Sequence, residues 1–399
     1  MKHLLTLDDL PAAELVGRRV FVRVDFNVPI AAGKVADATR LEKALPTLHE
    51  LQSKSARVIL AAHRGRPKGE PDPALSLRPV AETLSALLAA PVAWADDCIG
   101  PAAQQVCDNL ADGEVCLLEN LRFHAGEKAN DGDFGAALAA LAEIFVNDAF
   151  GTAHRAHASI VGVAERLPQR AAGRLLAREV EVLGALLGEP RRPFVAVIGG
   201  AKIAGKADTL IHLLPRLDTL VLGGAMANTF LAAQGHDMAA SLVEEDRVGM
   251  ARNILAQAEA RDTVVLLPRE LVVTDDPEEP GRIETVAVEK VPPGMMAVDV
   301  GAAFSQRLAA VLRDAGTVFW NGPLGVFERE PFAAGTVAAA RALADSPAYT
   351  IVGGGETVAA VRLAGVANRF GHVSTGGGAA LELLAGKTLP GVAALEVNR

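Results

Sequence analysis

The sequence is poor in aromatic residues and in cysteine, and each shortage narrows what the protein can be. Aromatic residues make up only 4% of the 399 residues, so the hydrophobic cores must consist mainly of Ala, Val and Leu. The three cysteines form an odd set without a CxxC spacing, which argues against a disulfide framework and favours buried, free thiols. A reducing, cytoplasmic location is therefore expected.

Long apolar runs and an excess of basic residues are also lacking. No stretch approaches the roughly 20 apolar residues of a membrane span. Asp8 and Asp9 interrupt the short apolar run near the N-terminus, so a secretory signal is not expected either. The formal net charge is -9 at pH 7, whereas nucleic-acid-binding proteins usually show the opposite balance. We therefore expect small-molecule partners, and neither a nucleic acid nor a membrane.

Familiar nucleotide-binding signatures are missing as well. The sequence contains neither the GxGxxG dinucleotide fingerprint in its glycine loops nor the HRD and DFG motifs of protein kinases. The segment from Gly200 to Lys206 has the spacing of a P-loop, but Ala207 follows where a P-loop needs a Ser or Thr hydroxyl for Mg²⁺. A P-loop-like ATPase therefore remains only an alternative interpretation.

Short β-rich runs alternate with helical segments along the whole chain, which is the pattern of parallel α/β sheets. Strands are expected at 20–24, 58–61, 92–94, 115–118 and 145–146, and again at 194–198, 219–222, 263–267, 317–320, 349–352 and 372–374. Helices are expected at 75–89 and 134–144, and from starts near residues 202, 225, 244, 303, 332, 356 and 378. This pattern predicts two doubly wound, Rossmann-like parallel-sheet domains.

The connection between the two domains is predicted to be a helical hinge. Residues 171–187 show an amphipathic pattern that stops at Gly188 and Pro190. The expected organisation is a first domain over 1–171, a linker helix over 172–188 and a second domain over 189–389. An ordinary surface helix within a single domain is the alternative.

The residues that follow the predicted strands differ between the two halves of the chain. In the first half, apolar runs lead into Arg and His, whose side chains bind phosphate and carboxylate oxygens. In the second half, comparable runs lead into glycines, whose backbone N–H groups can approach a nucleotide phosphate. Because ligands of open α/β sheets bind at the carboxyl ends of strands, we expect an anionic substrate in the first half and a nucleotide in the second.

Two places early in the chain carry candidate substrate ligands. Asp25, Phe26 and Asn27 directly follow the first predicted strand, and their carboxylate and amide could bind substrate hydroxyls. An Asx turn explains the same residues equally well. Arg40 begins an expected helix, where a solvated arginine is the ordinary alternative.

A sharper signal is the loop His63-Arg64-Gly65-Arg66-Pro67. It places three potential cations around one glycine directly after a buried strand, and Gly and Pro give the loop a defined shape. We interpret this loop as an anion-binding site.

The segment 148–157 presents His154, Arg155 and His157 after a strand that ends in an acid. No third metal ligand lies near the two histidines in the sequence. Anion binding by Arg155 is therefore preferred to a metal site.

In the second half, two lysines follow the diglycine at 199–200. Lys202 and Lys206 lie four residues apart, which would place them on one face of a starting helix. Two ammonium groups near a helix N-terminus form a strong phosphate site, whereas a solvent-facing lysine pair is the alternative. Farther along, Glu328 ends a rigid loop that begins at Trp320 and could hold ribose hydroxyls.

Two triglycine segments, 353–355 and 376–378, precede expected helices. Each offers free backbone N–H groups at a helix start, and the ordering entropy that every glycine costs argues that they serve a function. Glu356, directly after the first triglycine, could hold Mg²⁺ on the nucleotide.

Taken together, these segments resemble the phosphoglycerate kinase family. The matching motifs follow one another in the family's order over nearly the whole chain: Arg23-Val-Asp-Phe-Asn-Val-Pro29, His63-Arg-Gly-Arg-Pro67, Glu119-Asn-Leu-Arg-Phe123, 148–157, Gly199-Gly-Ala-Lys202, Trp320-Asn-Gly-Pro323 and the two triglycines. Glu356 stands where the family commonly has Asp, and Arg64 stands where it commonly has Leu. Neither departure removes a proposed catalytic group.

The resemblance implies a monomeric, hinge-bending kinase of glycolysis with two lobes. Such an enzyme transfers a phosphoryl group between 1,3-bisphosphoglycerate and ADP, giving 3-phosphoglycerate and ATP, with Mg²⁺. A non-catalytic anion-binding protein that kept the architecture is the non-enzymatic alternative. The resemblance also implies that residues 390–399 fold back on the first domain.

Roles for individual residues follow from the same resemblance. The phosphoglycerate would be held by Asp25, Asn27, Arg40, His63, Arg66, Arg122 and Arg155, with Phe26, Arg64 and Gly65 in the same loops. The magnesium nucleotide would be served by Lys202, Lys206, Asn321, Glu328, Gly354, Gly355, Glu356 and Thr357, with Glu356 as the metal ligand. The candidate catalytic groups are Arg40 and Lys202, which would neutralise the migrating phosphoryl group, and the backbone donors of Gly376, Gly377 and Gly378.

Overall fold

The computed structural model describes residues 2–398, and the chain divides into two compact units. Unit 1 contains the residues up to Glu181 together with those from Thr388 onward, and unit 2 contains Val182–Lys387. The division falls within helix α8 (Arg174–Leu187). The two-domain α/β architecture predicted from the sequence is confirmed.

Unit 1 is built around a six-stranded parallel sheet in the order β6-β7-β5-β2-β8-β9. Its strands are β2 (Arg19–Val24), β5 (Arg57–Ala61), β6 (Val92–Ala95), β7 (Val115–Leu118), β8 (Ile144–Asp148) and β9 (Gln169–Ala172). Strands β2, β5, β7 and β8 are buried almost throughout, as expected for parallel strands that are covered on both faces.

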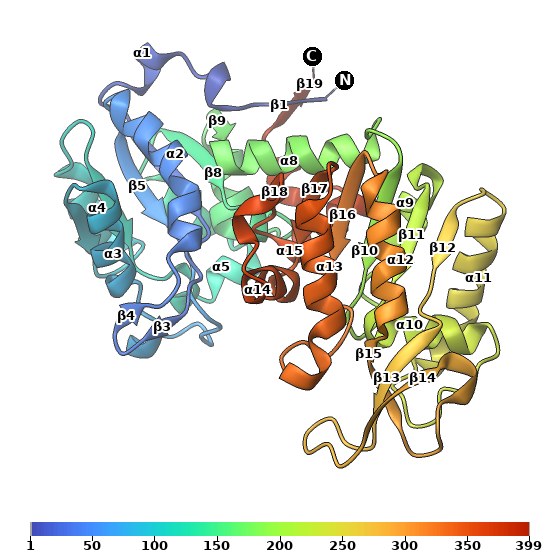
Figure 1. Ribbon diagram of the computed structural model, residues 1–399. Coiled ribbons are helices and arrows are strands. Elements are labelled where there is room, and N and C mark those ends of the chain that lie inside the picture. The colour runs from blue at the N-terminus through green and yellow to red at the C-terminus, as the bar shows by residue number, and fades with distance from the viewer. Residues whose placement is uncertain (1, 399) are drawn as a thin grey trace. The chain divides into compact units, whose positions relative to one another are not determined.

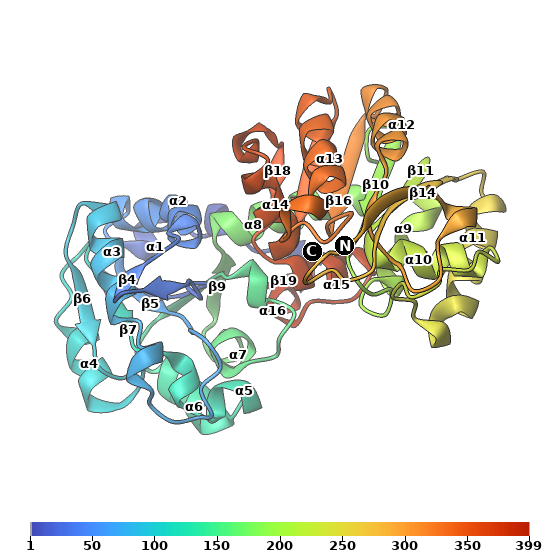
Figure 2. The same cartoon turned by 60° about the horizontal axis from the view of Figure 1, so that its bottom comes forward.

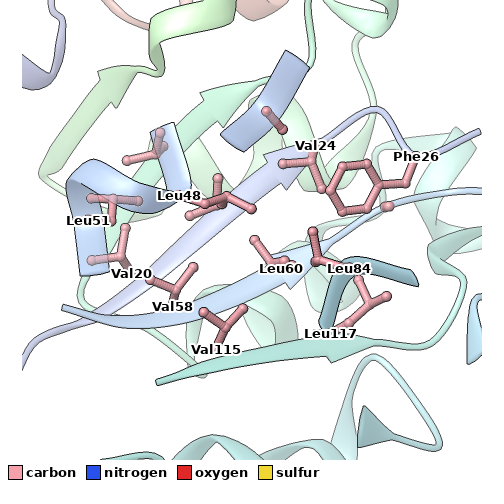
Figure 3. Packing of buried hydrophobic residues seen from close by; sticks show 14 of the residues in the cluster. Val20, Val24, Phe26, Leu48, Leu51, Val58, Leu60, Leu84, Val115 and Leu117 are labelled. Atoms are coloured by element: carbon pink, nitrogen blue, oxygen red, sulfur yellow. The ribbon is translucent and has the colours of Figure 1, made fainter. Parts of the chain in front are cut away.

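Helices cover both faces of this sheet. Figure 2 shows α2 (Thr39–Ser53) on one side of the strands and α5 (Gly126–Ala129), α6 (Gly132–Ala139) and α7 (Val163–Arg166) on the other. On the first side, α2 and α3 (Arg78–Leu88) contribute Leu48, Leu51 and Leu84 to a core with strand residues such as Val20 and Leu60 (Figure 3). Each such side chain contributes about 1.5–3 kcal/mol when fully buried.

The two ends of the chain meet in unit 1. Strand β1 (Lys2–Leu4) pairs antiparallel with β19 (Glu396–Asn398), and these strands lie side by side in Figure 1. Before β19, the short helix α16 (Pro390–Ala393) contacts the earlier part of unit 1, where Gly391 N–H donates to the Ala153 carbonyl at 2.8 Å. Residues 388–398 therefore belong to unit 1 although they follow unit 2 in the sequence, and Arg399 lies outside the described residues.

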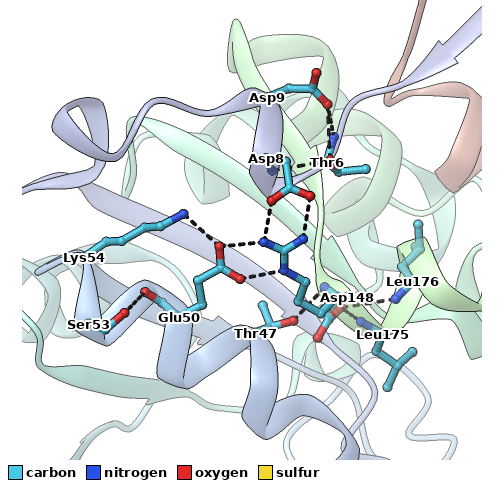
Figure 4. A network of polar contacts seen from close by, with 11 residues as sticks. Thr6, Asp8, Asp9, Thr47, Glu50, Ser53, Lys54, Asp148, Leu175 and Leu176 are labelled. Carbon is cyan, nitrogen blue, oxygen red and sulfur yellow. Dashed lines mark hydrogen bonds and ion pairs between the residues drawn. The ribbon is translucent and has the colours of Figure 1, made fainter.

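The start of α8 is anchored to unit 1 by ion pairs and a buried carboxylate (Figure 4). The Arg174 guanidinium donates to Asp8 at 2.7 Å and to Glu50 at 2.6 Å. One oxygen of Asp148, at the end of β8, accepts hydrogen bonds from the backbone N–H groups of Leu175 and Leu176 at 2.9 and 3.2 Å. These bonds satisfy helix donors that have no partner within the helix itself.

Unit 2 contains a second six-stranded parallel sheet, in the order β12-β11-β10-β16-β17-β18. Its strands are β10 (Phe194–Ile198), β11 (Thr219–Leu222), β12 (Val264–Leu266), β16 (Thr317–Asn321), β17 (Tyr349–Gly353) and β18 (His372–Val373). The chain begins in the middle, runs to one edge, and then returns to build the other half. The reversal between β10 and β16 is the switch point at which open α/β sheets bind their ligands.

The helices of unit 2 follow the strands in turn: α9 (Ala207–Leu213), α10 (Gly224–Ala233), α11 (Val248–Glu259), α12 (Ala302–Arg313), α13 (Ala334–Asp345), α14 (Gly355–Leu363) and α15 (Gly377–Leu384). Helices α12 and α13 stand side by side in Figure 1 and contribute Phe304, Leu308 and Leu343 to a core that they share with strand residues such as Val197 and Val318. A small antiparallel sheet, β14-β13-β15, is inserted after β12. Its strands are β13 (Glu270–Thr274), β14 (Ile283–Ala287) and β15 (Met296–Val300).

Some boundaries differ from the sequence predictions. The linker helix predicted over 172–188 spans Arg174–Leu187, because Ala172 belongs to β9 and pairs with β8. Helix α6 occupies Gly132–Ala139 and not 134–144, since the chain must turn before β8 begins at Ile144. The three cysteines are free and buried, as predicted. Within residues 2–398, no helix combines the length and the apolarity that crossing a membrane requires.

Candidate active site

In unit 1, the predicted substrate ligands gather at the carboxyl edge of the sheet. Asp25, Phe26 and Asn27 follow β2, His63 follows β5, Arg122 follows β7, and Arg155 follows β8. Arg40 is the second residue of α2, and its Nη1 donates to Oδ2 of Asp25. The Arg40 side chain is 38% exposed, whereas that of Asp25 is 11% exposed. One face of Arg40 is therefore available to a ligand while Asp25 holds the other.

The loop from His63 to Pro67 has a backbone conformation at its centre that strongly favours glycine. Gly65 has a φ of +64°, and a Cβ there would lie 2.6 Å from Cδ2 of Leu75. Its N–H donates to Oδ1 of Asn27 at 3.0 Å, and its carbonyl accepts from Nη1 of Arg122 at 2.7 Å. The loop therefore fixes Asn27 and Arg122, and the exposed Arg66 follows directly.

Two predicted ligands in these loops have structural contacts that differ from the predicted role. The Phe26 side chain is fully buried in the core of unit 1, so it anchors the turn and does not face solvent. The Arg64 guanidinium donates to the carbonyls of Ala74 and Ser76 at 2.6 and 3.3 Å. Arg64 thus fastens the neighbouring segment to the loop, because its donors are directed at backbone carbonyls.

Beneath the loop lies a buried network centred on Arg23. The Arg23 side chain is 0% exposed, and its Nε donates to Oγ of Ser159 at 2.9 Å. Ser159 in turn donates through Oγ to the buried carboxylate of Glu127 at 2.7 Å. Glu127 thereby supplies a counter-charge for Arg23, without which a buried guanidinium would be strongly destabilising.

Burial and Arg23 together determine the protonation of His63. Nη2 of Arg23 lies 3.1 Å from Nδ1 of His63, and a guanidinium can only donate. Nδ1 must therefore be the acceptor of a neutral imidazole whose proton sits on Nε2. Burial, reinforced by the positive charges of Arg23 and Arg122, lowers the pKa of His63 well below its usual value. His63 is thus a neutral Nε2–H donor at physiological pH.

The electrostatic field of this edge is strongly positive. Burial, followed by the charges of Arg23, Arg122 and Arg155, lowers the pKa of His157 to about 4. Nε of Arg122 is buried without a hydrogen-bond partner. A cluster of guanidiniums that, together with burial, keeps nearby imidazoles neutral and that holds an unpartnered donor is suited to bind a compact, multiply charged anion.

Sequence reasoning did not select Arg23, Glu127 or Ser159 as site residues. A detectable signal existed for Arg23, because a charged residue inside the apolar run of β2 requires a buried partner. The partner itself gave no signal, since Glu127 lies in the polar segment Gly126–Ala129, which reads as a solvated helix.

In unit 2, the glycine loops converge at the switch point. Gly199 N–H donates to the Asn321 carbonyl at 2.9 Å, and Gly200 N–H donates to the Pro323 carbonyl at 2.7 Å. Gly200 has a φ of +97°, and a Cβ on Gly224 would lie 2.6 Å from the Gly200 backbone. The loops after β10, β11 and β16 are therefore in direct backbone contact, and a residue larger than glycine at these positions would push them apart.

The two triglycine segments also meet. A Cβ on Gly377 would lie 2.6 Å from Cα of Gly354, so the loops after β17 and β18 are in backbone contact. Helix α14 begins at Gly355 and α15 at Gly377. The first turns of both helices thus direct backbone N–H groups to the same edge of the sheet, where phosphate oxygens can accept them.

The two lysines are arranged differently from the prediction. Helix α9 begins at Ala207, so Lys202 and Lys206 do not share a helical face. A turn that includes Gly205 separates them, and Lys206 Nζ donates to the Gly199 carbonyl. Burial lowers the pKa of Lys206 to about 8, while the charge of Glu356 opposes that shift. Lys202 is exposed at the surface of the same loop.

The remaining candidate residues of unit 2 are of two kinds: buried side chains that hydrogen-bond one loop to another, and exposed carboxylates. Asn321 Nδ2 donates to the Gly353 carbonyl at 2.9 Å, and Oγ1 of Thr357 accepts from Gly322 N–H at 2.7 Å. Both side chains are buried and hold the loops after β16 and β17 together. Glu356 is exposed in the first turn of α14, and Glu328 is exposed farther along the loop after β16.

Comparisons with known proteins agree on one family. A family model described as phosphoglycerate kinase matches residues 7–387. The chain is 54% identical over 391 residues to a phosphoglycerate kinase of Moorella thermoacetica, with 98% of each chain covered. It is also 54% identical over 384 residues to that of Desulforudis audaxviator, covering 96% of this chain and 97% of the relative.

Solved structures give the same result. The structure of phosphoglycerate kinase from Coxiella burnetii matches with a TM-score of 0.88 and 39% identity, covering 98% of this chain and 99% of that one. The crystal structure of the enzyme from Pyrococcus horikoshii matches with a TM-score of 0.83 and 32% identity, covering 98% of both chains. The similarity therefore extends over both units.

Proposed function

The chain belongs to the phosphoglycerate kinase family, and from this premise we propose how its two units perform the reaction. The enzyme transfers a phosphoryl group reversibly between 1,3-bisphosphoglycerate and ADP, giving 3-phosphoglycerate and ATP. The observation that carries the proposal is the contrast between two sheet edges. One presents guanidiniums around the neutral His63, and the other presents glycine amides with two lysines.

Unit 1 is proposed to bind the phosphoglycerate. Its phosphate and carboxylate oxygens would accept hydrogen bonds from Arg66, Arg122, Arg155 and the Nε2–H of His63, while Asp25 and Asn27 bind the hydroxyl. Forked guanidinium donors suit such oxygens. The unpartnered Nε of Arg122 and the positive field on His157 support this assignment. Phe26, Arg64 and Gly65 would hold the loops in shape without touching the substrate through their side chains.

Unit 2 is proposed to bind the nucleotide. Lys202 and Lys206 would pair with phosphate oxygens, backbone N–H groups of Gly354 and Gly355 would cradle them, and Glu328 would hold the ribose. Asn321 and Thr357 would keep the loops in place. A hard carboxylate within electrostatic reach of Lys206 suits Mg²⁺, and Glu356 is such a group. Bound Mg²⁺ would neutralise phosphate charge, which is the chemistry it supplies here.

The chemistry requires charge cancellation and alignment, and no general base. The acceptor in the ATP-consuming direction is a carboxylate, which is already ionised at neutral pH. We propose that Arg40 and Lys202 neutralise the migrating phosphoryl group while backbone donors of Gly376, Gly377 and Gly378 bind its oxygens. Direct transfer also requires the two units to close on each other, which excludes competing water. Family membership supports a monomer that works in the cytoplasm.

Coupled turnover tests the proposal. The full-length enzyme with MgATP is expected to form ADP only when 3-phosphoglycerate is present, and to lose activity when Mg²⁺ is chelated. Hydrolysis of MgATP without 3-phosphoglycerate would instead indicate a P-loop-like ATPase. Binding of both ligands without turnover, in correctly folded protein, would indicate a non-catalytic anion-binding protein.

A further inference from the structure

A second cluster of ligand-type side chains lies at the carboxyl edge of the unit 1 sheet. Asp97 and Cys98 follow β6, and His124 follows the short helical turn Leu121–Phe123 after β7. Because β6 and β7 are neighbouring parallel strands, their carboxyl ends bring these residues together. One ligand atom from each residue lies within 4.8 Å of the others, and Nε2 of His124 lies 2.7 Å from Oδ1 of Asp97.

The donor set determines which ion would suit this cluster. A thiolate sulfur, an imidazole nitrogen and a carboxylate oxygen form a borderline-soft set that Mg²⁺ and Ca²⁺ do not prefer. Zinc binds these three donors at about 2.0–2.3 Å, so adjacent ligand atoms in a tetrahedral site lie roughly 3.3–3.7 Å apart. Separations of up to 4.8 Å in the cluster would therefore need to shorten by about 1–1.5 Å, and the 2.7 Å between Nε2 of His124 and Oδ1 of Asp97 would need to lengthen by about 0.6 Å.

We propose that Asp97, Cys98 and His124 form a binding site for a zinc-class transition-metal cation, with water in the fourth position. Three protein ligands and one open position are a common arrangement for this ion. Among residues 2–398, this is the only group of three His, Cys, Asp or Glu side chains found with ligand atoms so close together.

The surroundings orient the ligands and leave a route for the ion. The His124 ring stacks on Phe134 with centroids 5.2 Å apart, which restricts its rotation. The backbone N–H of Cys98 donates to Oδ1 of Asp97 at 2.6 Å and fixes that carboxylate. Cys98 is fully buried at the inner end of the cluster, whereas the side chains of His124 and Asp97 are 30% and 45% exposed. An ion would therefore enter past the imidazole and the carboxylate.

The competing explanation is an ion pair between Asp97 and His124 above an inert thiol. Cys98 is fully buried, and a buried thiol without a bound cation is inert. The two explanations differ in the role of sulfur, because only a metal site converts Cys98 to a bound thiolate and releases its proton.

Cobalt titration of the full-length protein distinguishes the two explanations. Protein treated with chelator and free of nucleotide is titrated with Co²⁺, a coloured substitute for Zn²⁺. We expect one Co²⁺ per chain with a thiolate-to-cobalt charge-transfer band, and loss of that band when Zn²⁺ is added. Cys98→Ser should abolish the band, and His124→Gln should weaken Co²⁺ binding at least tenfold. Cys107→Ser, which changes a buried cysteine outside the cluster, should retain both band and affinity.

Several outcomes would overturn the proposal. These are absence of a charge-transfer band in folded protein, a band that persists in Cys98→Ser, or a band that is lost equally in Cys107→Ser. If circular dichroism shows that Cys98→Ser does not fold, the proposal is tested with variants of the two partly exposed ligands. Asp97→Asn and His124→Gln must then each weaken Co²⁺ binding at least tenfold, and unchanged binding in both refutes the site.

Discussion

At the scale of single residues, Arg40 carries the clearest kinetic prediction. We expect Arg40→Ala to lower kcat by about 10²–10³-fold, equivalent to ~3–4 kcal/mol of transition-state stabilisation. The dissociation constant for MgADP should change little, because the lysines and glycine loops belong to unit 2 while Arg40 belongs to unit 1. Steady-state kinetics and nucleotide titration measure the two effects. Lys43→Ala, which changes an exposed residue of the same helix, is the matched control and should keep normal turnover. Nearly normal turnover in Arg40→Ala would show that this arginine has no role in the mechanism.

Glu127 is expected to act through Arg23 and not on the substrate. Glu127→Gln keeps the shape of the side chain but removes the buried counter-charge of Arg23, so we expect about 3 kcal/mol lower stability of unit 1 in urea unfolding. The KM for 3-phosphoglycerate should also rise, since Arg23 positions His63. The exposed Glu165 supplies Glu165→Gln as a control for charge alone. Equal behaviour of the two variants would contradict the role of the network.

The lowered pKa of Lys206 predicts how nucleotide binding depends on pH. A pKa of about 8 in the folded protein means that the ammonium loses its proton at mildly alkaline pH. Phosphate binding favours the charged form, so the dissociation constant for ADP should increase as the pH rises above 8, by up to about tenfold per unit. Lys206→Arg should flatten this increase because a guanidinium stays charged. Calorimetric titrations from pH 7 to 9.5 test it, with Lys202→Arg expected to keep the wild-type slope.

At the scale of elements, the sequence predicted the parallel strands best. The predicted bounds of β10 and β11 match the structure, because a buried parallel strand is a short apolar run that ends at glycine or a charge. The small antiparallel sheet was missed. Strand β14 alternates exposed and half-buried residues, and the apolar run of β13 covers only residues 271–273, which is too short to stand out. Where β15 pairs with β13 it carries a bulge, because Val298 has no partner opposite Val272 and Val273.

In the candidate site, too, the features encoded by a local sequence pattern could be predicted, whereas those that depend on tertiary packing could not. Glycine and arginine loops could be recognised because they follow strands directly, and parallel topology then places them on one edge. The helical face assigned to Lys202 and Lys206 was wrong, because contacts with Gly199 hold Lys206 before the helix begins. The partnership of Glu127 with Arg23 depends on residues more than a hundred positions apart in the chain, which no local pattern encodes.

Helix α8 provides a test at this scale. Burial raises the pKa of Asp148, which caps the start of α8, to about 6. A folded-state pKa above the unfolded value of 3.8 means that ionisation opposes folding as the pH rises from about 4 to 6. Asp148→Asn keeps an acceptor for the helix N–H groups, so it should be more stable than wild type at pH 7.5, by up to about 3 kcal/mol. Urea unfolding should show this difference shrinking towards zero below pH 4, and a difference independent of pH would refute the assignment.

At the scale of the whole molecule, the chain is not divided where its sequence order suggests. Residues 388–398 leave unit 2 and complete unit 1, where β19 pairs with β1 and Leu395 is fully buried. Each unit has its own hydrophobic core. Unit 1 therefore cannot complete its fold until residues 388–398 have been synthesised, although most of it precedes unit 2 in the sequence.

The two tryptophans make this dependence measurable. Trp94 lies on β6 of unit 1 and Trp320 on β16 of unit 2. The variant Trp320→Phe keeps only Trp94 and so reports on unit 1 by fluorescence, whereas Trp94→Phe keeps only Trp320 and reports on unit 2.

Leu395→Ala, made in each of these two backgrounds, removes a fully buried side chain and should lower the free energy of unfolding by about 2–5 kcal/mol. In urea unfolding, the midpoint reported by Trp94 should fall more than that reported by Trp320, because Leu395 packs in unit 1. The exposed Leu363 of unit 2 gives Leu363→Ala as the control, which should shift neither midpoint appreciably. A larger shift at Trp320 would show that the C-terminal segment stabilises unit 2 instead, and an equal shift at both would show that the two units unfold as a single cooperative body.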